Sequence, residues 1–225
     1  MNINLFLREK VVETAKRILD FGLVTGTWGN ISIKDDKLLH VTPSGVLYPQ
    51  MRTSDVVTVD MNGNVVYGNL IPTSELPMHL AIYKNRSDVG AIIHFHGLYS
   101  SIISIIADEI PPLLEDIAMA LGYPLKVSKY AFPGTTELSE NVLEALGDNN
   151  AVYMRNHGAT AVGEDIEDAF LNAILAEKAA QIYYFSSIAT QEHQNLKVHY
   201  VPEKHARELR KKYLEKYKLL KKTTK

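Results

Sequence analysis

The segment Val89-Gly90-Ala91-Ile92-Ile93-His94-Phe95-His96 runs from a short apolar stretch into two histidines. The apolar run predicts a buried strand, and residues two apart on a strand project from the same face. His94 and His96 are therefore expected to leave one face of the sheet edge together. Imidazole is the commonest protein ligand for zinc-like ions, so the pair would supply half of a tetrahedral shell. The alternative is two exposed histidines on an amphipathic strand.

The segments on either side of this run alternate between helical and hairpin patterns. Helical spacing and capping residues predict helices near residues 5–19, 76–83, 98–107, 117–121, 135–146 and 165–187, and from 202 onward. Runs of β-branched residues predict strands at 31–33, 38–41, 56–59, 65–67, 151–155 and 159–162, with Asn62-Gly63 marking a hairpin. Hairpins exclude a simple parallel winding. We therefore predict one α/β domain over residues 1–225, with a largely antiparallel central sheet and helices on both faces.

The composition narrows the class of protein. The 225 residues are 46% apolar, carry a net charge of −2 and include no cysteine, which excludes disulfides, thiolate metal sites and cysteine nucleophiles. No signal peptide is evident, and the longest apolar stretch, residues 98–107, is too short to cross a bilayer. These features predict a soluble cytoplasmic protein with no nucleic-acid or membrane partner. A basic helix is expected at about residues 202–222, interpreted as a solvated face, with a phosphate or acidic-surface contact as the alternative.

Thr73-Ser74-Glu75 stands at the start of a predicted helix. Serine and threonine cap helices, and an early glutamate complements the helix dipole, so the segment needs no other function. The same residues place two hydroxyls, free backbone N–H groups and a carboxylate at a position suited to an anion.

A third histidine, His157, lies between two short apolar segments and is followed by Gly158. A histidine in such a loop is most simply a hydrogen-bonded structural residue. Together with His94 and His96 it would complete a three-imidazole site that leaves one position open to a substrate or a carboxylate.

Two glycine-containing turns, residues 26–30 and 42–45, combine glycine with short polar side chains. Glycine lets backbone N–H groups approach a ligand closely. Neither turn matches the dinucleotide fingerprint or the P-loop pattern, and each alone is simply a turn.

The order of these segments is more specific than any one of them. Gly-Asn, Thr-Pro-Ser-Gly, Thr-Ser-Glu, His-x-His and Asn-His-Gly follow one another along the chain. This succession resembles the class II aldolase/adducin family, from about Phe6 to about Ser187. The resemblance implies a homotetramer with active sites at subunit interfaces, acting on a small-molecule sugar phosphate.

The resemblance also implies a role for each matching residue. His94, His96 and His157 would bind one divalent ion per subunit, zinc in the first place, with manganese or cobalt as alternatives. Glu75 would ligate the resting metal and then act as general acid and base. The substrate phosphate would be held by the polar turns and hydroxyls, namely Gly29, Asn30, Ser44, Gly45, Thr73 and Ser74. In this sequence Thr73 replaces the usual serine, and Trp28 replaces a small residue.

One expected residue is missing. The tyrosine that helps proton transfer at C4 in the family's fuculose-phosphate enzymes has no counterpart in residues 110–116, and Glu115 stands at about that place. Glu115 would serve as a second catalytic residue, or it simply begins a helix. Tyr213 and Tyr217 are candidates for a tail aromatic that reaches a neighbouring subunit's site, or they are packing residues.

The activity implied is a metal-dependent aldolase, a carbon–carbon lyase. It would cleave a (deoxy)ketose 1-phosphate such as fuculose 1-phosphate, 5-deoxyribulose 1-phosphate or methylthioribulose 1-phosphate to dihydroxyacetone phosphate and an aldehyde. Trp28 or Phe132 would give an apolar lining for a deoxy or thioether end. The alternatives are a pentulose-5-phosphate 4-epimerase, a methylthioribulose-1-phosphate dehydratase, or a non-enzymatic adducin-like interaction module.

Overall fold

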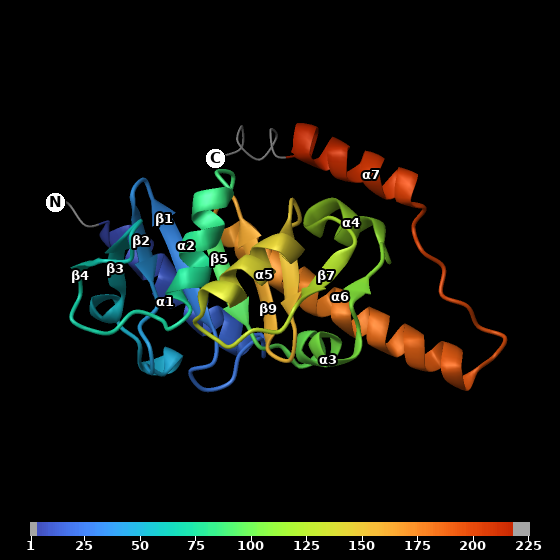
Figure 1. Ribbon diagram of the computed structural model, residues 1–225, viewed down its shortest axis with the longest axis horizontal. Helices are drawn as coiled ribbons and strands as arrows, with labels where there is room; N and C mark the ends of the chain where they lie inside the picture. Colours follow the sequence, from blue (N-terminus) through green and yellow to red (C-terminus); the bar gives the residue numbers. More distant parts are fainter. Residues whose placement is uncertain (1–3, 218–225) are drawn as a thin grey trace.

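The computed structural model describes residues 4–217 and is built around one mixed sheet (Figure 1). Its strand order is β4-β3-β2-β1-β5-β9-β8-β7-β6. All neighbouring strands are antiparallel except β7 and β8, which are parallel. The strands are β1 (Asn30–Asp35), β2 (Leu38–Val41), β3 (Val57–Asp60), β4 (Val65–Tyr67), β5 (Ala91–Phe95), β6 (Glu109–Ile110), β7 (Leu125–Ser128), β8 (Ala151–Met154) and β9 (Gly158–Gly163).

Seven α-helices surround this sheet in the described part of the chain. They are α1 (Leu5–Asp20), α2 (Leu76–Asn85), α3 (Leu98–Ile106), α4 (Glu115–Leu121), α5 (Thr136–Leu146), α6 (Ile166–Glu192) and α7 (Glu203–Lys212). Short helical turns η1 (Tyr48–Gln50), η2 (Thr53–Asp55) and η3 (Tyr213–Tyr217) complete the elements.

The sheet is buried on both faces, and the two hydrophobic clusters explain the layers. Residues of α1, α3, α4 and α6 pack with Ile31, Ile93 and Phe95 on one face. Residues of α2 and α5 pack with Ile92 and Val162 on the other. Burial of both faces accounts for the continuous apolar runs in β5 and β9. The predicted single α/β domain with helices on both faces is confirmed.

The predicted elements are present, with three differences. The sequence patterns missed β6 and β7 and the turns η1 and η2, and α6 continues to Glu192 rather than to about residue 187. The segment Leu125–Ser128 is short and has only Leu125 and Ser128 buried, so its strand conformation depends on pairing with β8. Such non-local pairing leaves little trace in a local pattern.

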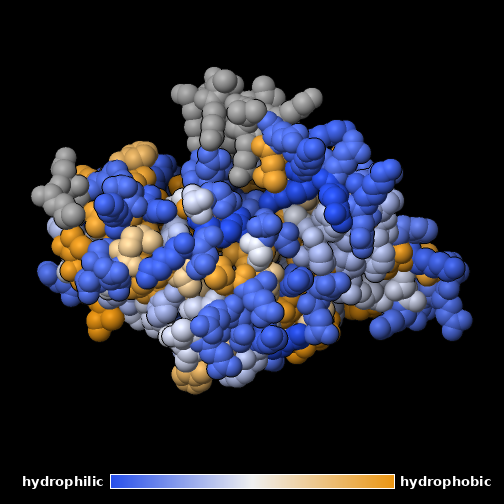
Figure 2. All heavy atoms as spheres, turned by 45° about the horizontal axis from the view of Figure 1, so that its top comes forward, coloured by the Kyte–Doolittle hydropathy of each residue, from blue (hydrophilic) through white to orange (hydrophobic). Residues whose placement is uncertain are grey.

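Helix α7 packs against α4 at the periphery, joined to α6 by a long connection (Figure 1). Figure 2 shows mainly hydrophilic side chains on this face, interrupted by smaller hydrophobic areas. Arg210 is not simply solvated, because its Nη1 donates to the carbonyl oxygens of Met119 at 2.8 Å and Ala120 at 2.7 Å. It thereby caps the end of α4 and holds α7 in place. The sequence predicts that the basic helix continues to about residue 222, but residues 218–225 lie outside the part of the chain that the structure describes.

No helix in residues 4–217 is both long and apolar enough to cross a membrane.

Candidate metal centre

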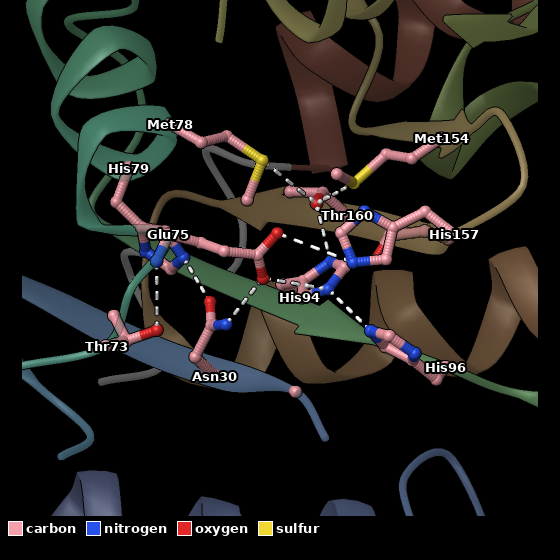
Figure 3. Close-up of polar contacts among 12 residues, drawn as sticks. Asn30, Thr73, Glu75, Met78, His79, His94, His96, Met154, His157 and Thr160 are labelled. Atoms are coloured by element: carbon pink, nitrogen blue, oxygen red, sulfur yellow. Dashed lines mark hydrogen bonds and ion pairs between the residues drawn. The ribbon is translucent and has the colours of Figure 1, made fainter. Parts of the chain in front are cut away.

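Strand β5 is central in the sheet and carries His94 beside polar residues of both neighbouring strands. His94 pairs with Asn30 of β1 and with Thr160 of β9, so the three residues form one row across the sheet. His94 is fully buried, whereas His96 lies just beyond the strand end and is half-buried. The predicted projection of both histidines from one face therefore holds, and Figure 3 shows them meeting.

His157 reaches the same place through the turn between β8 and β9. Asn156 in this turn has a φ of 55°, the left-handed conformation that asparagine tolerates better than most residues. Gly158 is required for a different reason: a Cβ there would lie 2.5 Å from the carbonyl oxygen of Phe95. Arg155 anchors the turn by donating to the carbonyl oxygen of Ala107 at 2.8 Å. The His157 ring consequently lies 4.8 Å from the ring of His94 and 4.9 Å from that of His96.

These three residues form the histidine cluster. Their potential ligand atoms all lie within 4.8 Å of one another, and the Nε2 atoms of His94 and His96 are 2.8 Å apart. Nδ1 of His94 lies 3.0 Å from the carbonyl oxygen of Ala159, which can only accept, so Nδ1 carries the proton. In the neutral ring the lone pair is then on Nε2, which faces the cluster. A ligand histidine is commonly oriented by a backbone carbonyl in this way.

Two rings of the cluster, those of His94 and His96, favour the neutral state. Burial, reinforced by the neighbouring histidines, holds the pKa of His94 well below its usual value. Burial, with His157 nearby, lowers the pKa of His96 to about 4. A neutral imidazole is the form that binds a metal.

Glu75 adds a carboxylate to the cluster. It immediately precedes α2, is 5% exposed, and places Oε2 3.0 Å from Nε2 of His94 and Oε1 3.5 Å from Nε2 of His157. Oε1 is buried without a hydrogen-bond partner. An unpaired buried carboxylate oxygen is costly, and a cation shared with the imidazole lone pairs removes that cost. The donor set of three imidazoles and one carboxylate fits a zinc-like divalent ion.

A cavity of about 260 Å³ opens beside the cluster. Glu75, His96 and His157 line this cavity, and so do all six residues that were predicted to hold the substrate phosphate. We call these six residues the cradle: Gly29, Asn30, Ser44, Gly45, Thr73 and Ser74. No lysine or arginine of the described residues lines this cavity. An anion there would be bound by hydroxyls, backbone N–H groups and the N-terminal end of α2.

The cradle is shaped by its turns. Gly29 has a φ of 124°, and a Cβ at this position would lie 2.6 Å from Cγ1 of Val24. The hydroxyl of Tyr48 donates to the carbonyl oxygen of Gly29 at 2.6 Å and fixes the turn. Thr73 does not act as the predicted side-chain cap of the helix, since the N-cap residue is Glu75; its hydroxyl instead accepts the N–H of Glu75 at 3.3 Å. These bonds set the direction in which Glu75 enters the cavity.

Two predicted residues, Glu115 and Phe132, stand apart from the cavity, and two more, Tyr213 and Tyr217, lie near the end of the tail. Glu115 is exposed at the first residue of α4 and does not line the cavity. Phe132 is 71% exposed and does not line it either; Pro133 and Trp28 do. Tyr213 is half-buried in η3, and the side chain of Tyr217 lies outside the described part of the structure.

Two contributors to the site were not predicted. His79 is fully buried one helical turn after Glu75. Glu177 of α6 accepts the N–H groups of Tyr99 at 2.7 Å and Ser100 at 2.9 Å, in the first turn of α3 shortly after His96. The spacing of four residues between Glu75 and His79 was the one available signal for His79. Glu177 gave none, because its partners lie far away in the sequence.

Comparison with known proteins identifies the family. Residues 9–184 match the family described as Class II Aldolase and Adducin N-terminal domain. The chain belongs to this family, as its ordered motifs predicted.

Individual relatives narrow the class of enzyme. The chain is 37% identical over 179 residues to 5-deoxy-D-ribulose 1-phosphate aldolase of Bacillus thuringiensis, covering 79% of this chain and 84% of the relative. It is 33% identical over 178 residues to 5-methylthioribulose-1-phosphate/5-deoxyribulose-1-phosphate aldolase of Rhodospirillum rubrum, covering 79% and 80%. A solved structure of an L-fuculose 1-phosphate aldolase superposes with a TM-score of 0.86 at 31% identity, covering 92% of this chain and 95% of that one. The predicted class of enzyme, a class II aldolase and hence a carbon–carbon lyase, is confirmed.

Proposed function

We propose that this protein cleaves a (deoxy)ketose 1-phosphate to dihydroxyacetone phosphate and an aldehyde, using one divalent ion. The observation that carries the proposal is the meeting of three imidazoles and Glu75 at the edge of the cavity lined by the cradle. The names of the relatives support an aldolase over an epimerase or a dehydratase. The complete set of metal-binding side chains argues against a purely structural role.

His94, His96, His157 and Glu75 would hold the ion. When bound, it supplies Lewis-acid stabilisation of the negative charge that develops on the substrate's enediolate oxygens. Because the imidazoles are neutral, they leave most of the ion's positive charge available for that purpose.

The proton movements fall to side chains. A base takes the proton of the C4 hydroxyl, the C3–C4 bond breaks, and its electron pair passes into the C2–C3 enediolate. Glu75, which borders the cavity, is placed to take up a proton from solvent and pass it to C3. Glu115 is our candidate for the base that takes the proton of the C4 hydroxyl. Because Glu115 does not line the cavity of its own chain, this role requires that it act in the site of a neighbouring subunit.

The cradle would hold the phosphate. Hydroxyls and backbone N–H groups can bind a phosphate without any positively charged side chain, and the dipole of α2 strengthens the attraction for the anion. Asn30 also has a second role, because its Nδ2 donates to Oε2 of Glu75 at 2.8 Å. One N–H of the amide is left to the substrate.

The far end of the substrate would meet Trp28. Its indole lines the cavity, is 67% exposed, and lies 6.3 Å from the His96 ring. A flat apolar wall suits a methyl or thioether end, which favours 5-deoxyribulose 1-phosphate or methylthioribulose 1-phosphate as substrate.

We further propose zinc as the ion, with manganese or cobalt as alternatives, and a homotetramer in the cytoplasm. Large apolar side chains exposed on α3 and α6, namely Leu98, Ile105, Ile106 and Phe185, support contact with further copies of the chain. The absence of cysteine agrees with a compartment in which disulfides are not formed.

The test is a metal analysis of the purified protein followed by cleavage assays on a panel of ketose 1-phosphates, coupled to detection of dihydroxyacetone phosphate. We expect one divalent ion per chain and the fastest cleavage with a deoxy or thioether substrate. Metal without triose product would instead indicate an epimerase or a dehydratase.

A further inference from the structure

His79 is a fully buried histidine whose two ring nitrogens are both engaged. Nε2 lies 2.6 Å from Oδ1 of Asn30, and Nδ1 lies 2.6 Å from Oγ of Ser32. Figure 3 shows His79, Asn30 and Glu75 in succession, leading toward His94. The other buried positions of α2 are mainly apolar, including Leu76, Met78 and Ile82. An apolar side chain would suit this position, so the imidazole is best explained by its partners.

The direction of the hydrogen bonds follows from the chemistry of the groups. An ionised carboxylate only accepts, so Asn30 donates its Nδ2–H to Oε2 of Glu75 and turns Oδ1 toward His79. Oδ1 also only accepts, which requires the proton of His79 to be on Nε2. Nδ1 then accepts the hydroxyl proton of Ser32, whose oxygen lies 2.9 Å from the hydroxyl of Tyr83. The donors therefore point along one chain toward Glu75.

The neutral state of His79 agrees with this direction. Complete burial lowers the pKa of His79 to about 4, and the ring faces no ionised partner directly. A neutral ring has one donor and one acceptor nitrogen, which is what Asn30 and Ser32 require.

We infer that His79 is a positioning residue that fixes the Asn30 amide and, through it, the Glu75 carboxylate. Without the Nε2–H donor, Asn30 is free to turn over and present its carbonyl oxygen to Glu75, and the carboxylate loses its orienting bond. The inference rests on the proposed function, since it assigns Glu75 the proton transfer that the orientation serves. His79 touches neither the cavity nor the histidine cluster, so its effect must pass through Asn30.

The first experiment compares His79→Leu with His79→Gln. Glutamine can present an amide N–H near the position of Nε2, whereas leucine can only fill the space. We expect His79→Leu to lower kcat by about 10- to 100-fold, as for other residues that orient a ligand, with KM nearly unchanged. His79→Gln should recover most of the lost turnover. Equal losses in both variants would overturn the inference.

His40→Leu is the matched control. His40 is also fully buried, with Nδ1 2.9 Å from Oγ1 of Thr58, but it lies on β2 and this hydrogen-bond partner lies on β3, away from the site. We expect it to lower the melting temperature as His79→Leu does while leaving kcat per folded enzyme unchanged. A matching fall in kcat would show that loss of any buried histidine suffices, and would overturn the inference.

A double-mutant cycle tests the route through Asn30. In an Asn30→Ala background, His79→Leu should change kcat by less than about twofold, because the residue it positions is gone. Independent, multiplying losses would mean that His79 acts by another route.

Nitrogen-15 NMR of histidine-labelled wild-type protein needs no activity. We expect His79 to be neutral at pH 5 as the Nε2–H tautomer; the Nδ1–H tautomer or a protonated ring would overturn the inference. If no ketose phosphate is cleaved, the proposed function fails, and this spectrum still decides whether the hydrogen-bond chain runs toward Glu75.

Discussion

The histidine cluster and the peripheral region formed by α4 and α7 differ in how completely one chain builds a functional site there. In the cluster, the buried ring of His94 is held by a backbone carbonyl, and Glu75 lies 3.0 Å from His94 and 3.5 Å from His157. By contrast, Glu115 is exposed, and α7 with Tyr213 packs at the periphery against α4. One chain thus supplies the groups that would stabilise the enediolate, whereas the group that moves the C4 hydroxyl proton has to come from a more open part of the protein. The predictions below test this division.

Removing a cluster ligand should have the largest effect. We expect His94→Ala to lose the bound ion and to lower kcat on the order of 10³-fold, because Lewis-acid stabilisation supplies several kcal/mol. Elemental analysis and the cleavage assay measure both losses. Extraction of the ion with a chelator should cause the same loss of metal and activity in the wild-type protein. Added zinc, manganese or cobalt should then restore activity to the wild-type protein but not to His94→Ala. A variant that keeps full activity would contradict the proposed site.

Glu115→Gln should have the next largest effect, if the open region supplies the second proton-transfer group. We expect kcat to fall about 10²-fold with the ion retained, as is usual when a general acid or base is lost. Asp116→Asn is the matched control, since Asp116 pairs with Lys178 on the surface at 2.8 Å and accepts the N–H of Ile117 at 2.9 Å, away from the cavity. Equal and small effects of the two changes would remove Glu115 from the mechanism, and Tyr213→Phe would then be tested in the same way.

The cradle should affect binding more than turnover. Ser74→Ala removes an exposed hydroxyl from the cavity wall, and we expect KM for a ketose 1-phosphate to rise about 10-fold, the value of one hydrogen bond to a charged group. Activity on the corresponding unphosphorylated ketose should not change. If both substrates lose equally, Ser74 does not bind the phosphate.

The same division explains what could be predicted from the sequence. His94 and His96 share a local period of two, and the cradle residues lie in turns with recognisable polar and glycine patterns, so both were found. His79, Ser32 and Glu177 escaped because their partners become neighbours only where α2 lies against β1 and where α6 packs on α3. Strand β7 was missed for the same reason. Phe132 was misjudged because its side chain turns away from the cavity while Pro133, the next residue, lines it.

Trp28 should have the smallest effect, confined to the choice between substrates. Its indole lines the cavity 6.3 Å from the His96 ring, where it can cover an apolar substrate end but offers no hydrogen-bond acceptor to a hydroxyl. A pocket contact with one methyl group contributes about 1 kcal/mol, so Trp28→Ala should lower kcat/KM for a deoxy or thioether ketose about fivefold relative to a hydroxylated one. Phe132→Ala, which removes a ring of similar exposure outside the cavity, should leave this ratio unchanged. Equal losses of kcat/KM on both substrates would mean that Trp28 stabilises the Gly29 turn rather than contacting the substrate. A preference for a deoxy end would then have to come from residues that another subunit contributes to the site.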